Sequence, residues 1–160
     1  MLTPIIEMDG KHYGSLSIES LSEFAYPFPA PQYPCLIWDH GSDFSIDEIY
    51  DFTHVLIKTG CRYLVCGGER CELWHDLMDE AIVMTEVDSG KDLDLIMTTW
   101  HTNKSTEEVA DFFIRCAKLD DCEFTHYLVL HMGTGDGHNV VNEAVRKEVI
   151  AKHEDKEDLL

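Results

Sequence analysis

Four short apolar segments of the chain are each followed by polar side chains that could do chemistry. In chain order, these side chains are Asp39, His40 and Asp43, then Glu69 and Cys71, then Trp100 and His101, and finally His131. In a parallel α/β sheet, ligands bind beyond the carboxyl ends of the strands. If the four segments are parallel strands, these groups gather at one edge of the sheet, and we predict the functional site there.

Three of these residues, His40, His101 and His131, are candidate metal ligands. Imidazole nitrogens and a carboxylate such as Asp39 or Asp43 are a common ligand set for zinc or iron. The chain has no CxxC pair and no two histidines one helical turn apart. Each histidine could therefore equally hydrogen-bond to loop backbone at the end of its strand, with no cofactor involved.

A cysteine nucleophile is the second possibility. Cys71 lies at the predicted start of a helix, where free amides and the helix dipole favour a thiolate. His101 would be its base, and Asp39 would orient that base. The flanking Glu69 and Glu72 oppose a thiolate, and a buried structural thiol is the alternative. Cys71, His101 and Asp39 are thus the predicted catalytic residues.

A glycine-rich segment, Gly133-Thr134-Gly135-Asp136-Gly137, offers a third possibility. A strand, a glycine-rich loop and a helix start together present backbone amides to an anion such as phosphate. The spacing matches neither the dinucleotide fingerprint nor the P-loop, and Asp136 would repel a phosphate. The residues predicted to bind a ligand are His40, Asp43, Glu69, Trp100, Gly133 and Gly135.

Two helices that would position these groups have clear boundaries in the sequence. Ser45 and Glu48 have the spacing of a capping box, and Gly60 supplies a left-handed stop. Ser105 and Glu108 repeat the capping box. A helix of about 14 residues between two short apolar segments predicts a right-handed crossover between parallel strands.

The remaining elements follow from apolar periodicity. We predict strands at 35–38, 63–66, 93–99 and 127–130, and helices at 46–59, 71–81, 106–117 and 140–151. Residues 82–87 could extend a helix or form a strand, and their β-branched content favours the strand. The predicted fold is a three-layer α/β/α sandwich on a mostly parallel sheet of four or five strands, flavodoxin-like or Rossmann-like. Strand order does not follow from the spacing.

The predicted domain covers residues 35–152. Residues 1–34 include a proline-rich stretch from Tyr26 to Pro34 and are expected to form an extended segment packed on the domain. Residues 153–160 are expected to be a frayed acidic tail.

The charge of the chain bears on its partners. The sequence has 31 acidic and 12 basic residues, a net charge of −19 with neutral histidines. Such a chain repels nucleic acid and anionic membranes and favours a basic protein partner. No apolar run is long enough to span a membrane, and the N-terminus does not resemble a signal peptide. The six cysteines lie in or beside core-forming segments, which indicates reduced thiols and a cytoplasmic protein.

Three segments of the chain resemble a family of small bacterial proteins known as a domain of unknown function. They are residues 60–74 (GCRYLVCGGERCELW), 97–101 (MTTWH) and 128–131 (LVLH). The resemblance covers about residues 35 to 131 and implies an intracellular protein of bacterial or phage origin. It implies no activity.

Two functional hypotheses remain open. The first is an acidic binding protein that acts on a basic protein partner without a cofactor, as an immunity, antitoxin or defence-accessory protein does. The second is a small hydrolase or transferase with a Cys/His or metal site, zinc or iron, at the carboxyl ends of the strands. The charge and the lack of a tight catalytic motif favour the first.

Overall fold

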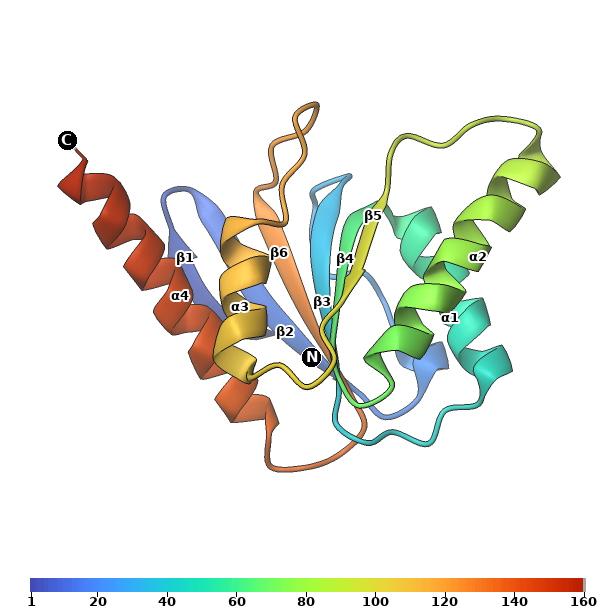
Figure 1. Ribbon diagram of the computed structural model, residues 1–160, viewed down its shortest axis with the longest axis horizontal. Coiled ribbons are helices and arrows are strands. Elements are labelled where there is room, and N and C mark those ends of the chain that lie inside the picture. The colour runs from blue at the N-terminus through green and yellow to red at the C-terminus, as the bar shows by residue number, and fades with distance from the viewer. Residues whose placement is uncertain (160) are drawn as a thin grey trace.

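A six-stranded sheet forms the centre of the molecule, which the computed structural model describes over residues 1–159 (Figure 1). Across the sheet the strands are, in order, β1 (Thr3–Met8), β2 (Lys11–Ile18), β6 (His126–Met132), β3 (Tyr33–Asp39), β4 (Cys61–Gly68) and β5 (Met97–Trp100). The pairs from β2 to β5 are parallel, and β1 is antiparallel to β2. The predicted α/β fold on a mostly parallel sheet is confirmed, although the sheet has six strands and not four or five.

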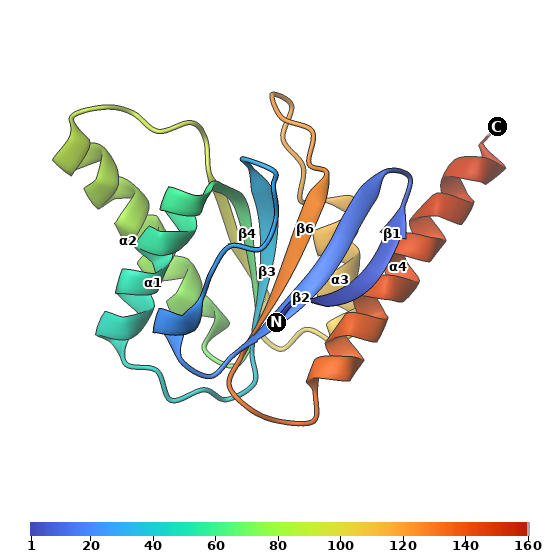
Figure 2. The ribbon, with the colours of Figure 1, turned by 180° about the vertical axis from the view of Figure 1, so that it is seen from behind.

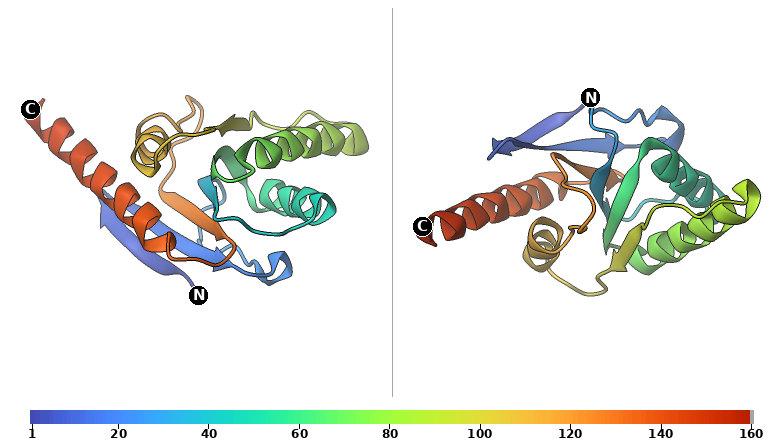
Figure 3. Two further views of the ribbon diagram at one scale, coloured as in Figure 1. Left: turned by 60° about the horizontal axis from the view of Figure 1, so that its bottom comes forward. Right: turned by 90° about the horizontal axis from the view of Figure 1, so that it is seen from above.

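Helices cover both faces of this sheet, as the sandwich prediction requires (Figure 3). On one face lie α1 (Ile46–Thr59) and α2 (Cys71–Ser89), and on the other lie α3 (Thr106–Arg115) and α4 (His138–Asp158). The strands alternate between these two cores: Cys35 and Ile37 of β3 face α1 and α2, whereas Leu36 faces α3 and α4.

The two serine caps form as the sequence predicts. The Oγ of Ser45 accepts a hydrogen bond from the Glu48 amide at 3.1 Å, and the Oγ of Ser105 accepts one from the Glu108 amide at 3.1 Å. The αL residue Gly60 ends α1. These local signals fix where α1 and α3 begin.

Residues 3–18 belong to the sheet and are not merely packed on it. They form the hairpin of β1 and β2, which lies beside α4 at one end of the sheet (Figure 2). Asp9 and Gly10 both have positive φ, 55° and 76°, as a tight hairpin turn requires. The Asp-Gly pair therefore indicates a hairpin. The prolines from Pro27 to Pro34 led to the prediction of an extended segment packed on the domain, which is wrong for the residues that form this hairpin. A 3₁₀ turn, η1 (Leu21–Glu23), begins the connection from β2 to β3.

The structure also corrects the predictions for residues 82–87 and for the strand at 93–99. Residues 82–87 are helical, because α2 continues to Ser89 and ends at the αL residue Gly90. Its β-branched Val83 and Val87 are exposed, so they form no buried strand face. The strand predicted at 93–99 is the shorter β5.

The acidic tail is also helical through Asp158, and the predicted fraying is wrong for residues 153–158. His153 contacts Asp9 at 2.8 Å, and Arg115 contacts Asp155 at 2.8 Å. These pairs hold the last turns of α4 against α3 and the turn between β1 and β2.

The strand order creates one topological switch point. β3 and β6 are neighbours, but the chain leaves β3 toward α1 on one face and leaves β6 toward α4 on the other (Figure 3). In open α/β sheets, ligands bind in the crevice that such a reversal opens beyond the carboxyl ends of the strands. The fold thus singles out the ends of β3 and β6.

No helix formed by residues 1–159 combines the length and the apolar character that crossing a membrane requires.

Candidate functional site

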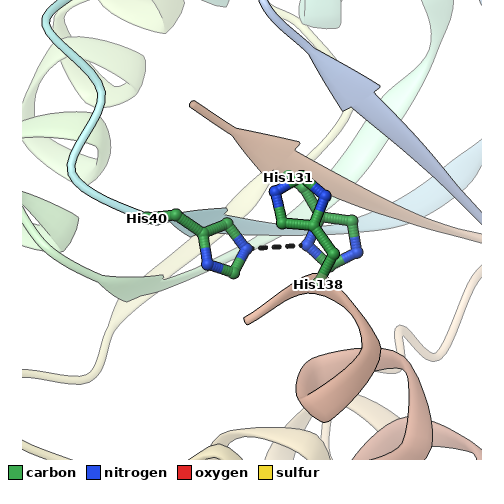
Figure 4. A group of neighbouring side chains, drawn as sticks. All are labelled: His40, His131 and His138. Carbon is green, nitrogen blue, oxygen red and sulfur yellow. Dashed lines mark hydrogen bonds between the residues drawn. The ribbon is translucent and has the colours of Figure 1, made fainter. Parts of the chain in front are cut away.

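Three histidines meet at the switch point between β3 and β6 (Figure 4). His40 follows β3, His131 is in β6, and His138 is the first residue of α4. One ring nitrogen from each lies within 4.8 Å of those of the other two, and no other group of metal-ligating side chains in residues 1–159 meets this criterion. We call these residues the His cluster.

Hydrogen bonds fix the orientation of the buried His131. Its Nε2 lies 2.8 Å from Oδ1 of Asn142, an atom that can only accept, so Nε2 carries the proton. Asn142 is held in turn by its Nδ2, which donates to Oγ of Ser15 at 2.9 Å. The lone pair of His131 is therefore on Nδ1, which lies 2.8 Å from Nε2 of His40 and accepts a hydrogen bond from it.

His138 is held in a similar way. Its Nε2 donates to the carbonyl oxygen of Gly133 at 3.1 Å, so its lone pair is on Nδ1. That nitrogen accepts a hydrogen bond from Oγ of Ser17 at 2.9 Å. The His138 ring stacks on the His131 ring with centroids 4.4 Å apart and an angle of 8° between the planes.

Burial keeps two members of the cluster uncharged at neutral pH. Burial and the nearby His138 lower the pKa of His40 to about 4, against the opposing effect of Asp39. Burial lowers the pKa of His131 to about 4, and His138 and His40 act in the same direction, whereas the bond to Asn142 opposes them. A neutral imidazole is the form that binds a metal.

A cleft of about 690 Å³ adjoins the His cluster, and His40 lies in its wall. Its lining also includes Asp39, Glu69, Cys71 and His101. These side chains therefore lie together at one edge of the sheet, as the sequence predicted.

The predicted catalytic trio shares this cleft without forming a hydrogen-bonded relay. The Sγ of Cys71, whose residue is only 4 % exposed, lies 3.7 Å from Oγ1 of Thr102. His101 has its Nε2 3.0 Å from Oγ1 of Thr99, and its ring packs on Phe112 at 4.6 Å. Neither residue hydrogen-bonds to the other, so the cysteine has no base in contact.

Asp39 organises the loop after β3. It is buried, and its Oδ1 accepts from the amides of Gly41 and Ser42 at 2.9 and 2.7 Å. Its Oδ2 accepts from Nε1 of Trp74 at 2.9 Å and from the Ser42 hydroxyl at 3.1 Å. Arg70 forms an ion pair with it at 3.3 Å. With these partners Asp39 has no contact with His101, and its role is to fix the backbone that carries His40.

The other predicted ligand-binding residues are scattered around this edge. Asp43 is exposed on the loop after Asp39, outside the lining of the cleft. Trp100 is 45 % exposed and packs on His75 at 4.3 Å. Gly133 and Gly135 have φ of 92° and 150° in the loop between β6 and α4. In this loop the Gly133 amide donates to the carbonyl oxygen of Ile18 at 3.2 Å and so is not free to bind an anion, while the Gly133 carbonyl accepts a hydrogen bond from His138.

The sequence pointed to His101 as the third histidine, whereas the structure brings His138 to His40 and His131. His138 directly follows the glycine-rich segment at the start of a helix that was expected only from Val140. A histidine at a helix start beside a strand-end loop was the available signal.

The comparison with curated protein sequences gave no match. A family model matches residues 12–148, which include the whole His cluster and the lining of the cleft. The expectation of a family without an assigned activity is confirmed. Because the match spans most of the chain, the protein belongs to the family described as Domain of unknown function (DUF7684).

Proposed function

We propose that this protein binds a divalent transition metal, with zinc the best fit, at the His cluster and uses it for hydrolysis in the adjoining cleft. One observation carries the proposal: three imidazoles from separate elements converge within 4.8 Å at the topological switch point. Imidazole nitrogen suits zinc, and three histidines with an open fourth position are a known catalytic zinc set.

The outer hydrogen bonds of the cluster support this function. Histidines that bind metals usually donate their second ring N–H to a carbonyl or another acceptor, which fixes the tautomer. His131 donates its Nε2 proton to Asn142, and His138 donates its Nε2 proton to Gly133. Both arrangements leave Nδ1 as the lone-pair nitrogen.

Binding an ion requires small rearrangements within the cluster. Two imidazole nitrogens on a tetrahedral zinc are about 3.3 Å apart, given zinc–nitrogen bonds of about 2.05 Å. The nitrogens of His40 and His131 are now 2.8 Å apart, so they would separate by about 0.5 Å, and the shared proton would leave Nε2 of His40. The His138 ring, parallel to that of His131, would tilt and release Ser17.

The cleft offers room for a substrate beside the ion. A zinc ion with three protein ligands binds water and lowers the pKa of that water to about 7, which supplies a nucleophile at neutral pH. His40 joins the cluster to the cleft wall, and Glu69 and His101, which also line the cleft, could accept a proton. Metal-assisted hydrolysis is therefore the reaction class that the arrangement supports best.

Zinc binding by the untagged, chelator-stripped protein tests the proposal. We expect one equivalent of zinc by isothermal titration and elemental analysis. Loss of a residue that hydrogen-bonds to a metal-binding histidine weakens metal binding by about 10–100-fold. His138→Gln removes a ligand itself and should weaken zinc binding by more than this. His101→Gln is the matched control, since it removes a histidine from the same edge but not from the cluster. Equal zinc affinity in wild type and His138→Gln would overturn the metal site.

A second measurement separates metal binding from catalysis. The zinc-loaded protein should hydrolyse an activated ester or phosphodiester such as p-nitrophenyl acetate or bis-p-nitrophenyl phosphate. This activity should disappear with chelator and in His138→Gln. If the protein binds one equivalent of zinc but hydrolyses neither substrate, the proposed metal site stands and the proposed hydrolase activity is overturned.

A further inference from the structure

The region around β5 has an unusual concentration of exposed apolar side chains. Eleven large hydrophobic residues are exposed in the described part of the chain, and six of them lie between residues 83 and 100. These six are Val83, Met84, Val87, Leu95, Met97 and Trp100. Leu95, Met97 and Trp100 lie in or next to β5, and we call these three, together with the free edge of the strand, the β5 edge surface.

β5 is an edge strand with unpaired backbone groups. It lies at the end of the sheet and pairs only with β4. The amide of His101 donates to the carbonyl of Cys66, so the backbone groups of alternate residues, Met97 and Thr99, also face β4. The N–H and C=O groups of Thr98 and Trp100 therefore point outward, where another strand could pair with them.

The opposite edge of the sheet has features that discourage such pairing, whereas β5 is short, with four residues, but has neither a proline nor an irregular register. β1 contains Pro4, has an irregular register between Pro4 and Ile6, and contacts α4. Proline and strand irregularity are devices that block edge-to-edge association. The sequence of β5, Met97-Thr-Thr-Trp100, has neither proline nor a charged residue.

The surroundings of the β5 edge surface are strongly acidic. Residues 71–100 contain eight acidic residues and one basic residue, Lys91. The acidic residues are Glu72, Asp76, Asp79, Glu80, Glu86, Asp88, Asp92 and Asp94, and all except the half-buried Glu86 are exposed. This charge favours a basic occupant and disfavours a second copy of this chain, whose net charge is −19.

A groove beside the edge would receive side chains of the added strand. It has a volume of about 390 Å³, and it is lined by the apolar or aromatic residues Tyr63, Leu95, Met97 and Leu119 and by the charged residues Lys118, Asp120 and Asp121. Side chains of a strand alternate between the two faces of the sheet. Apolar residues of the occupant could enter the groove, while basic residues on its other face lie near the acids of α2.

We infer that the β5 edge surface binds an extended basic segment of another protein, which pairs with β5 as a seventh strand. Backbone pairing with Thr98 and Trp100 would supply affinity, and alternating apolar and basic side chains would supply specificity. The surface shares no residue with the His cluster, so this interaction is independent of metal binding.

A short peptide probes the interaction directly. We expect fluorescein-labelled acetyl-(Lys-Val)₃-amide to bind the full-length protein, with fluorescence anisotropy as the readout. The affinity should fall with salt, and acetyl-(Glu-Val)₃-amide should not bind. Amide chemical shifts of Thr98 and Trp100 should move on binding. Absence of binding at millimolar basic peptide in low salt would overturn the inference.

Three variants, two of them with matched controls, test the location. Thr98→Pro removes an outward N–H that the sheet does not use and should weaken binding more than tenfold, whereas Thr98→Val keeps this N–H and should bind normally. Met97→Lys should weaken binding through charge on the apolar surface. Asp92→Asn with Asp94→Asn should weaken it, but Glu154→Gln with Asp158→Asn, the same charge change at the end of α4, should not.

Melting temperatures show whether each variant is folded. Unchanged peptide affinity in folded Thr98→Pro and Met97→Lys would overturn the inference. So would sedimentation showing a wild-type dimer that Thr98→Pro dissociates, because the occupant would then be a second copy of the chain.

Discussion

The Nε2 atom of His40 lies 2.8 Å from Nδ1 of His131, although the two residues are 91 positions apart in the chain. The contact exists because β6 inserts beside β3, which aligns Trp38 with His131 and places His40 just beyond this pair. His138 joins them because α4 begins five residues after Gly133, whose carbonyl binds its ring. This relationship is the basis of the proposed metal site and of two of the predictions.

Zinc should stabilise the protein against unfolding. At a free zinc concentration about 100 times the Kd, binding to the folded state alone adds about 2.7 kcal/mol to the free energy of unfolding. For a chain of this size that corresponds to a rise in Tm of about 5–10 °C. Differential scanning calorimetry should show the rise in wild type and in His101→Gln, but not in His138→Gln. A similar rise in all three would place the zinc elsewhere.

The metal-free protein should lose stability in mild acid. The pKa values of His40 and His131 are lowered to about 4 in the folded state, below their ordinary 6.5. The unfolded chain therefore binds more protons between about pH 6.5 and 4, and the free energy of unfolding falls as pH decreases through this window. The fully buried His131 alone contributes up to about 3 kcal/mol.

Urea denaturation at several pH values in the presence of chelator measures this effect. His131→Asn should flatten the pH dependence, because it removes a histidine whose pKa is lowered by burial. A wild-type stability that is constant from pH 6.5 to 4.5 would contradict the prediction.

Replacing Asp39 should destabilise the fold. In Asp39→Ala the indole N–H of Trp74 and the guanidinium of Arg70 lose their carboxylate partner. Removing one member of a fully buried ion pair costs about 3–5 kcal/mol, and we expect the lower end of this range because the Arg70 side chain is 31 % exposed. Asp43→Ala, at an exposed position four residues later, should change stability by no more than about 0.5 kcal/mol. Urea denaturation distinguishes the two, and a native-like stability for Asp39→Ala would return Asp39 to the list of candidate catalytic groups.

Only one of the six cysteines should react quickly with a thiol reagent such as Ellman's reagent. Cys116 is exposed, whereas Cys35, Cys61, Cys66 and Cys71 are buried. Burial also raises the pKa of the thiols of Cys35 and Cys66 well above the ordinary value. The half-buried Cys122 donates to Gln32 and should react more slowly.

Cys116→Ser should therefore abolish the fast phase. In denaturant, all six thiols of the wild type should react, and one fewer in the variant. A fast phase that persists in Cys116→Ser and is lost in Cys71→Ala would instead support the cysteine nucleophile.

The sequence by itself determined the elements whose signals are local. Ser45, Gly60 and Ser105 mark helix ends through contacts with backbone a few residues away, and the predicted boundaries of α1 match the structure. Strands alternating with helices predicted a parallel sheet, and hence that the groups after each strand gather at one edge. Local signals failed in the second half of α2, where β-branched propensity suggested a strand but the helix continues to Ser89 with Val83 and Val87 exposed.

Only the tertiary structure decided which histidines meet. The position of β6 between β2 and β3 depends on contacts between residues more than 90 positions apart. The residues near His40 in the sequence do not indicate which residue lies beside His40 across the sheet. That order brings His131 and His138 to His40 and leaves His101 beyond β5, hydrogen-bonded to Thr99. The sequence was enough to predict the edge of the sheet where a site could form, because the ends of strands are marked by local residues. The tertiary structure decided which residues form the site, because strand order depends on contacts between distant parts of the chain.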